Sequence, residues 1–188
     1  ASGPFGHAAG NFNGDGYPDL AVAMYDSGTI KVFLGSGGGA FTEAGGSPVT
    51  VGTGPLRIVT ADLDNNGTAD LVVSNNGNNT ITVLLGNGDG TFSAAPGSPL
   101  AAGASPVGLT TALMDQDGSP DIVVANGGAS TFSLFAGNGD GTFQPRQDYG
   151  TGAGPISLAS GDFDGDSNTD LAVANSAGNT VSVFLQTE

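Results

Sequence analysis

Four short windows of the sequence are crowded with carboxylate and amide side chains at a fixed spacing. They cover residues 11–19, 62–70, 113–121 and 162–170, and they hold twelve of the 18 acidic residues of the chain. Oxygen-bearing side chains recur at positions 1, 3, 5 and 9 of the windows. Alternate residues of a tight loop point inward and can surround one hard cation with oxygens, as the opening of an EF-hand loop does. The pattern therefore indicates a cation-binding loop that is repeated along the chain.

Each window supplies side-chain ligands and one backbone carbonyl, at position 7. The candidate ligands are Asn11, Asn13, Asp15, Tyr17 and Asp19 in the first window, Asp62, Asp64, Asn66, Thr68 and Asp70 in the second, Asp115, Asp117, Ser119 and Asp121 in the third, and Asp162, Asp164, Asp166, Asn168 and Asp170 in the fourth. We expect the third site to be the weakest, because Leu113 replaces its first ligand. The fourth has Ser167 where the others have glycine, which predicts strain if that position needs a left-handed backbone.

Calcium is the ion that these windows favour, with up to four ions per chain, one per repeat. Many flexible oxygen ligands suit Ca²⁺ better than Mg²⁺. Zinc is disfavoured because the chain has no cysteine and a single histidine. The alternative interpretation is a set of solvated turns, since Asp, Asn and Gly are common in turns without any metal. Four windows in register favour the metal sites.

The segments around the windows are typical of short β-strands. The closing aspartate recurs at spacings of 51, 51 and 49 residues, and an apolar run such as DLVVSN always follows it. An alternating stretch such as NTITVLLG comes next, and a Gly-Asp-Gly turn follows it at residues 86–92 and 137–143. A stretch that begins with proline precedes each window. No segment has a helical period. A repeated antiparallel unit of four strands and about 40–50 residues is a β-propeller blade. The sequence therefore predicts an all-β propeller of about four repeats, small or partial.

The repeats fill one domain, residues 1–188, but the last one is incomplete. The expected blades are 1–51, 52–102, 103–151 and 152–188, and the last lacks the GNGDGTF segment and its outer strand. A half-ring would leave two exposed sheet edges, which invite association. We therefore expect self-association with a second chain, or the remainder of a larger propeller, to complete the ring.

The composition of the chain limits the kinds of partner that the protein is expected to bind. The formal charge is −15, with only three basic residues, so we expect no nucleic-acid partner. We also expect no membrane insertion, because no apolar run approaches the ~18 residues of a spanning helix. Residues 1–10 lack the features of a signal peptide, so we expect a mature or excised piece.

The repeat unit resembles a known family. The stretches GDFDGDSNTDLAVAN and NTITVLLGNGDGTF, with their counterparts in the other copies, resemble the FG-GAP-like or VCBS repeat, which is related to the calcium-binding blades of the integrin α-subunit propeller. The resemblance implies that each loop binds Ca²⁺ between inner strands of a blade. The integrin-type GAP tripeptide is missing, which favours a bacterial VCBS-like branch. The resemblance to this family implies an extracellular or cell-surface protein with a role in adhesion or assembly.

Nothing in the sequence points to catalysis. His7 is the only histidine, no cysteine is available as a nucleophile, and the carboxylate pairs all fall in repeated loops. We therefore expect a protein or glycan ligand and no enzymatic activity. Two alternatives stay open: a carbohydrate-binding, lectin-like propeller, and the non-catalytic scaffold of a polysaccharide-degrading enzyme.

Overall fold

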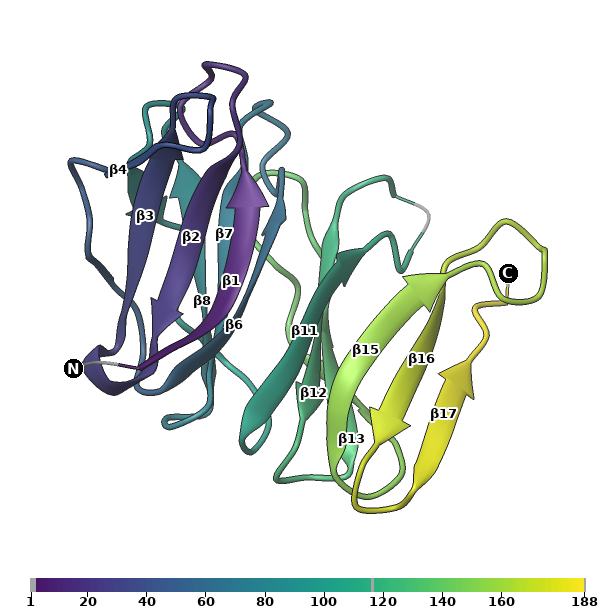
Figure 1. The fold of residues 1–188 in the computed structure, drawn as a ribbon. Helices are drawn as coiled ribbons and strands as arrows, with labels where there is room; N and C mark the ends of the chain where they lie inside the picture. The colour runs from purple at the N-terminus through teal and green to yellow at the C-terminus, as the bar shows by residue number, and fades with distance from the viewer. Residues whose placement is uncertain (1–2, 116, 188) are drawn as a thin grey trace.

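The fold is a row of antiparallel β-sheets that follow one another in chain order. The computed structural model describes residues 3–115 and 117–187. Its strands form four sheets, which we call blades 1 to 4, and they run side by side from the purple N-terminal end to the yellow C-terminal end of Figure 1. The described residues are all-β apart from one short 3-10 turn, η1 (Tyr25–Ser27). This architecture confirms the predicted propeller of about four blades.

The strand order is the same in every blade, with the strand that begins in proline at the inner edge. Blade 1 contains β1 (Pro4–Gly10), β2 (Asp19–Met24), β3 (Thr29–Gly35), β4 (Phe41–Glu43) and β5 (Val49–Thr50). Blade 2 contains β6 (Pro55–Ala61), β7 (Asp70–Asn75), β8 (Thr80–Gly86), β9 (Phe92–Ala94) and β10 (Leu100–Ala101). Blade 3 contains β11 (Pro106–Ala112), β12 (Asp121–Asn126), β13 (Thr131–Phe135) and β14 (Gln147–Gly150). Blade 4 contains β15 (Pro155–Gly161), β16 (Asp170–Asn175) and β17 (Thr180–Phe184).

The outer edges of the blades differ from one another. In blades 1 and 2 the fourth strand is split into two short pieces, and both pieces pair with the third strand. The interruptions contain Ser47-Pro48 and Ser98-Pro99, and a proline cannot donate to a strand ladder. Blade 4 has only three strands among the described residues, as the sequence predicts, so β17 forms its outer edge.

The inner strands of consecutive blades lie next to each other, in the order β1, β6, β11 and β15 (Figure 1). Glycine is needed where two of them come closest. A Cβ atom at Gly6 would lie 2.2 Å from the carbonyl oxygen of Leu56, and one at Gly108 would lie 2.8 Å from that of Ile156. The absence of a side chain therefore lets the backbones of neighbouring blades approach each other.

The core consists of three apolar layers, one between each pair of consecutive blades. We call the face of a blade that packs on the following blade its forward face, and the opposite face its rear face. The first layer joins Ala21, Ala23, Ile30 and Val32 of blade 1 to Ile58, Leu71, Val73 and Leu84 of blade 2. The second joins Val72, Ile81 and Val83 to Ile122, Val124 and Phe135. The third joins Val123 and Phe132 to Leu171 and Val173.

The side chains of the second strand of each blade alternate between the two faces of the sheet. Their burial therefore depends on whether a neighbouring blade covers each face. Strands β7 and β12 are buried at every position, as expected for strands covered on both sides. The apolar runs DLAVAM and DLAVAN predict strands buried on both faces as well, and for β2 and β16 this prediction is wrong: in each of them some residues are only half-buried. These two strands belong to the terminal blades, where one face has no neighbouring blade among residues 3–115 and 117–187.

In the part of the chain that the structure describes, no helix is both long and apolar enough to cross a membrane.

Candidate metal sites

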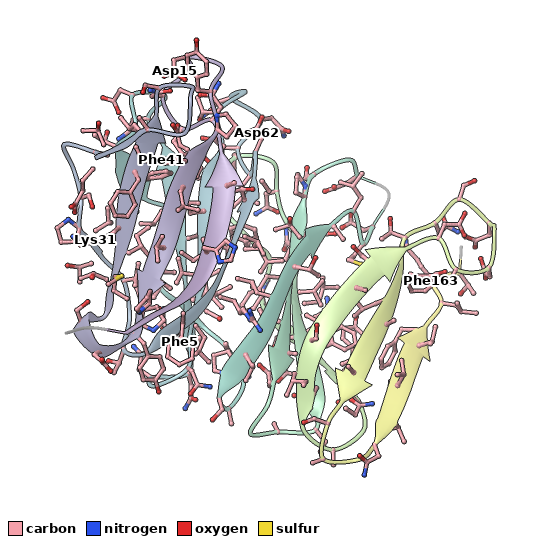
Figure 2. All side chains as sticks on the ribbon, in the orientation of Figure 1. Phe5, Asp15, Lys31, Phe41, Asp62 and Phe163 are labelled. Atoms are coloured by element: carbon pink, nitrogen blue, oxygen red, sulfur yellow. The ribbon has the colours of Figure 1, made fainter. Side chains whose placement is uncertain are left out.

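The four acidic windows form equivalent loops at one edge of the blades. Each loop connects the inner strand of its blade to the second strand. Because the blades share one topology, the loops lie along the same edge, where Figure 2 labels Asp15 and Asp62. The structure therefore places the predicted site residues in four separate, equivalent loops.

The aspartate at position 9 is a buried structural acceptor in every loop. Its two carboxylate oxygens accept backbone N–H groups, one from position 2 of the loop and one from the last residue of the third strand or from two residues beyond it. The bonds to Asp19 come from Phe12 (2.7 Å) and Gly35 (2.8 Å), those to Asp70 from Leu63 (2.7 Å) and Gly86 (2.8 Å), those to Asp121 from Met114 (2.6 Å) and Gly137 (2.8 Å), and those to Asp170 from Phe163 (2.7 Å) and Gln186 (2.9 Å). This carboxylate therefore ties three segments of a blade together, a role that the sequence interpretation missed.

The side chain at position 1 holds the turn of the loop. Asp62 accepts the N–H groups of Asn66 (3.1 Å) and Gly67 (2.9 Å). Asp162 does the same for Gly165 (2.6 Å) and Ser167 (3.0 Å). In the first loop Asn11 accepts the N–H of Gly14 at 2.9 Å. Leu113, which is exposed, has no oxygen to do this in the third loop.

Positions 3 and 5 form successive turns closed by side-chain oxygens. The oxygen at position 3 accepts the N–H of position 5 in all four loops: Asn13 from Asp15, Asp64 from Asn66, Asp115 from Asp117, and Asp164 from Asp166. The oxygen at position 5 accepts the N–H of position 7 at 2.7–2.8 Å: Asp15 from Tyr17, Asn66 from Thr68, Asp117 from Ser119, and Asp166 from Asn168. The windows therefore do form turns closed by their own side chains, as in the alternative interpretation of the sequence. This arrangement leaves lone pairs on these oxygens for a cation, because a carboxylate oxygen can accept more than one partner.

Two loops bring three carboxylates close enough to share one ion. Oxygens of Asp62, Asp64 and Asp70 lie within 4.8 Å of one another, and so do those of Asp162, Asp164 and Asp166. Within the described residues, loops 1 and 3 form no such cluster of three carboxylates. The second and fourth loops are therefore the strongest candidates for a divalent cation.

Burial and mutual repulsion act on these carboxylates. Burial is the main cause that raises the pKa of Asp70, and the charges of Asp64 and Asp62 raise it further, against two backbone hydrogen bonds. The pKa of Asp121 is raised in the same way, chiefly by burial. Hydrogen bonds from Thr91 and Thr142 instead lower the pKa values of Asp89 and Asp140 in the exposed Gly-Asp-Gly turns. A bound cation would relieve the repulsion in the loops.

These shifts predict the order in which the carboxylates titrate in the metal-free protein. Asp70 and Asp121 are expected to take up protons at a higher pH than Asp89 and Asp140, as followed by NMR of the carboxyl carbons. A folded-state pKa above the unfolded value means that the folded chain binds more protons, so this contribution to stability falls as the pH rises through that window. Identical titration midpoints for the two pairs would contradict the assignment.

Position 6 of the loops requires a left-handed backbone. The φ angle is 83° at Gly16, Gly67 and Gly118, and it is 73° at Ser167. A residue with a Cβ atom is strained there by roughly 1–2 kcal/mol. The strain expected in the fourth loop is therefore present in the structure.

Replacing Ser167 with glycine is expected to stabilise the protein by up to about 1 kcal/mol, because relief of strain is partly offset by the greater freedom of glycine in the unfolded chain. The matched change Gly67→Ser should destabilise it by a similar amount. Chemical denaturation in the presence of a chelator measures both. A stability loss in Ser167→Gly would show that its side chain contributes more than the strain costs.

The Gly-Asp-Gly turns of blades 2 and 3 each connect the acidic loop of the preceding blade to their own blade. The N–H of Gly90 in blade 2 donates to the carbonyl of Phe12 in loop 1 at 2.9 Å. The N–H of Gly141 in blade 3 donates to the carbonyl of Leu63 in loop 2 at 3.1 Å. The acidic loops of blades 1 and 2 are therefore held from both sides.

Comparison with known families decides the relationship. The family described as FG-GAP-like repeat matches residues 11–73 and 114–187, which include all four loops except the position-1 residue of the third. The chain belongs to the FG-GAP-like repeat family. The comparison with curated proteins gave no match.

Solved structures share the fold of this FG-GAP-like chain at low sequence identity. A functionally unknown protein from Desulfotomaculum acetoxidans is 20% identical with a TM-score of 0.71, and the match covers 96% of this chain and 54% of that one. A candidate 6-phosphogluconolactonase from Bacteroides uniformis is 15% identical with a TM-score of 0.71, over 98% and 51% of the two chains. A lectin from Agrocybe aegerita that recognises terminal N-acetylglucosamine is 19% identical with a TM-score of 0.57, over 96% and 52%. The FG-GAP-like chain thus spans about half the length of these structures.

Proposed function

We propose that this FG-GAP-like protein is a calcium-binding propeller module that acts in adhesion or protein assembly at the outside of a bacterial cell, without catalysis. The cluster of Asp62, Asp64 and Asp70 carries the proposal, because three carboxylates within 4.8 Å of one another suit a hard divalent cation. Asn66 and the carbonyl of Thr68 would complete an all-oxygen ligand set. The corresponding groups of the fourth loop, including Asp170 and Asn168, would form a second strong site.

The role of the ion would be structural. Each Ca²⁺ would neutralise a cluster of carboxylates and hold the loop against the buried strand that follows it. Four ions would change the formal charge of −15 to −15 + 8 = −7. Extracellular calcium is abundant enough to fill sites with dissociation constants of about 0.1–1 mM, which are common in extracellular modules. This agrees with a role outside the cell.

The absence of catalysis is supported by the repetition of the site. The close carboxylate clusters lie in equivalent loops of blades 2 and 4. Their pattern of hydrogen bonds also recurs in blades 1 and 3, which suits a repeated structural element better than one reaction centre. His7 is exposed on the inner strand of blade 1 and belongs to none of these loops.

Calorimetric titration with CaCl₂ tests the proposal. The wild-type protein is expected to bind at least two ions, and the variant Asp62→Asn/Asp64→Asn should bind one fewer. The matched control is Asp89→Asn/Asp140→Asn, which removes the same number of charges from the exposed turns and should bind as the wild type does. Absence of any calcium heat at millimolar concentration in the wild type would contradict the proposal.

Carbohydrate binding is the second candidate. A groove of about 460 Å³ lies between the first two loops, and polar residues such as Asn11, Thr60 and Thr68 line it. One solved structure with the same fold is a lectin for terminal N-acetylglucosamine. Screening on a glycan array, with and without Ca²⁺, separates this candidate from a role in protein assembly alone.

A further inference from the structure

The forward face of blade 4 is apolar and uncovered. Val181 and Val183 lie opposite Ala174 and Ala172 in the ladder of β16 and β17, so these four side chains share one face. The two valines are 65% and 54% exposed. In blade 2, Ile81 and Val83 hold the same two positions and are 0% exposed under blade 3. Blade 4 therefore presents half of an interface that the chain builds three times elsewhere.

The rear face of blade 1 presents the other half. Leu20 and Phe33 are opposite each other in the ladder, and Val22 continues the same face. All three are only half-buried. The equivalent residues of blade 2, Leu71, Leu84 and Val73, are buried against the forward face of blade 1.

A pair of aromatic residues marks the two free faces most clearly. Inside the chain, Phe92 of blade 2 packs edge-on against Phe12 of the preceding loop, with ring centroids 5.4 Å apart. The residues equivalent to these two at the free ends are Phe41 on blade 1 and Phe163 on loop 4, and they are 53% and 49% exposed. Figure 2 shows them at opposite ends of the row of blades.

The charges near the faces do not prevent them from meeting. Of the acidic loops, only loop 4 takes part, through Phe163, which lies between Asp162 and Asp164. The equivalent Leu63, which lies between Asp62 and Asp64 in loop 2, packs in the apolar layer between blades 2 and 3 in the same way. On the rear face of blade 1, Lys31 and Glu43 form an ion pair at 3.0 Å, so neither charge would be left alone when the face is covered.

We propose that a second copy of this chain covers both faces: the forward face of blade 4 in each copy packs on the rear face of blade 1 in the other. Two such head-to-tail contacts close a ring, because a heterologous interface that closes on itself gives a cyclic assembly. Two copies supply eight blades, within the usual size of propellers. The chain covers 54% and 51% of two solved structures with this fold, so two copies match the length of one of them. This inference does not rest on calcium binding.

Mass in solution tests the pairing. Sedimentation equilibrium of the 188-residue chain at 0.15 M salt should give twice the monomer mass of 18.2 kDa. A mass of 18.2 kDa up to 100 µM protein, a concentration chosen to favour weak pairing, would overturn the proposal. A mass that keeps growing with concentration would overturn the closed ring.

Two substitutions test the direction of the pairing. Val183→Asp on blade 4 and Phe41→Asp on blade 1 should each raise the dissociation constant of the dimer at least tenfold. Head-to-tail contact requires both faces, whereas pairing of two blade-4 faces would be weakened by Val183→Asp alone, and that outcome would overturn the proposal. Both positions are exposed in the single chain, so circular dichroism should show that both variants fold.

Cross-linking gives a second readout that needs no charge in the interface. The chain has no cysteine, so Phe41→Cys and Phe163→Cys each introduce a single thiol. A short bis-maleimide should link the two variants to each other when they are mixed, and should link each variant to itself much less. Equal or greater linkage within either single variant would overturn the head-to-tail arrangement.

Discussion

Replacing Asp121 with alanine is expected to lower the free energy of unfolding by about 3 kcal/mol, because each buried donor left without an acceptor costs about 1–3 kcal/mol. The carboxylate is buried and accepts the N–H groups of Met114 and Gly137. Loop 3 is the best place for this test, because Leu113 leaves it without the first metal ligand. For a chain of this length the melting temperature should fall by roughly 6–12 °C in excess chelator.

Two further variants separate the hydrogen bonds from the charge. Asp121→Asn keeps one acceptor oxygen and should lie between the wild type and the alanine variant. Burial raises the pKa of Asp121, so loss of the charge itself should cost little. Asp117→Ala, in the exposed part of the same loop, should change stability far less. If Asp121→Ala melted with the wild type, the buried aspartate would have no structural role.

Calcium is expected to raise the melting temperature by about 10 °C or more between excess chelator and 10 mM CaCl₂. For a dissociation constant of about 0.1 mM, at the tight end of the range for extracellular modules, 10 mM CaCl₂ is about 100 times that constant and stabilises the folded state by about 2.7 kcal/mol per site. Two sites of this kind, in loops 2 and 4, would add about 5 kcal/mol at roughly 2–4 °C per kcal/mol. Differential scanning calorimetry at constant ionic strength measures the shift.

The controls for this experiment follow from the ligand sets. The variant Asp62→Asn/Asp64→Asn should lose part of the shift, and the corresponding changes at Asp162 and Asp164 should lose a similar part. MgCl₂ should stabilise the protein less than CaCl₂, because Mg²⁺ demands a more regular ligand geometry and dehydrates reluctantly. Equal melting temperatures in chelator and in calcium would exclude a structural role of the ion.

The arrangement of strands could be predicted because local sequence patterns, repeated in each blade, determine it. Runs such as DLVVSN, preceded by a stretch that begins with proline, become the second and first strands of each blade. The missing outer strand of blade 4 could be predicted for the same reason. Repetition also placed the four loops at equivalent positions. Each of these features depends on residues that are close together in the sequence.

The role of the position-9 aspartate could not be predicted, because its partners are distant in the sequence. Asp70 accepts N–H groups from residues 7 positions before and 16 positions after it. Its spacing within the window looks the same for a metal ligand and for a buried acceptor. The partial exposure of β16 also could not be predicted from its local sequence, since its run DLAVAN resembles DIVVAN of the fully buried β12. Only the position of the blade in the row decides which face is covered.

The contacts between the Gly-Asp-Gly turns and the preceding loops make the blades at the two ends of the chain unequal in their resistance to unfolding. The turn of blade 2 donates a hydrogen bond to the acidic loop of blade 1, and the turn of blade 3 donates one to the acidic loop of blade 2. Blade 4 ends its sheet at β17 and has no such turn among its described strands. In a protein whose repeats are stabilised mainly by their neighbours, the least supported repeat opens first. Unfolding of the 188-residue chain on its own is therefore expected to begin at blade 4 and to proceed toward the N-terminal half, where the middle blades are covered on both sides.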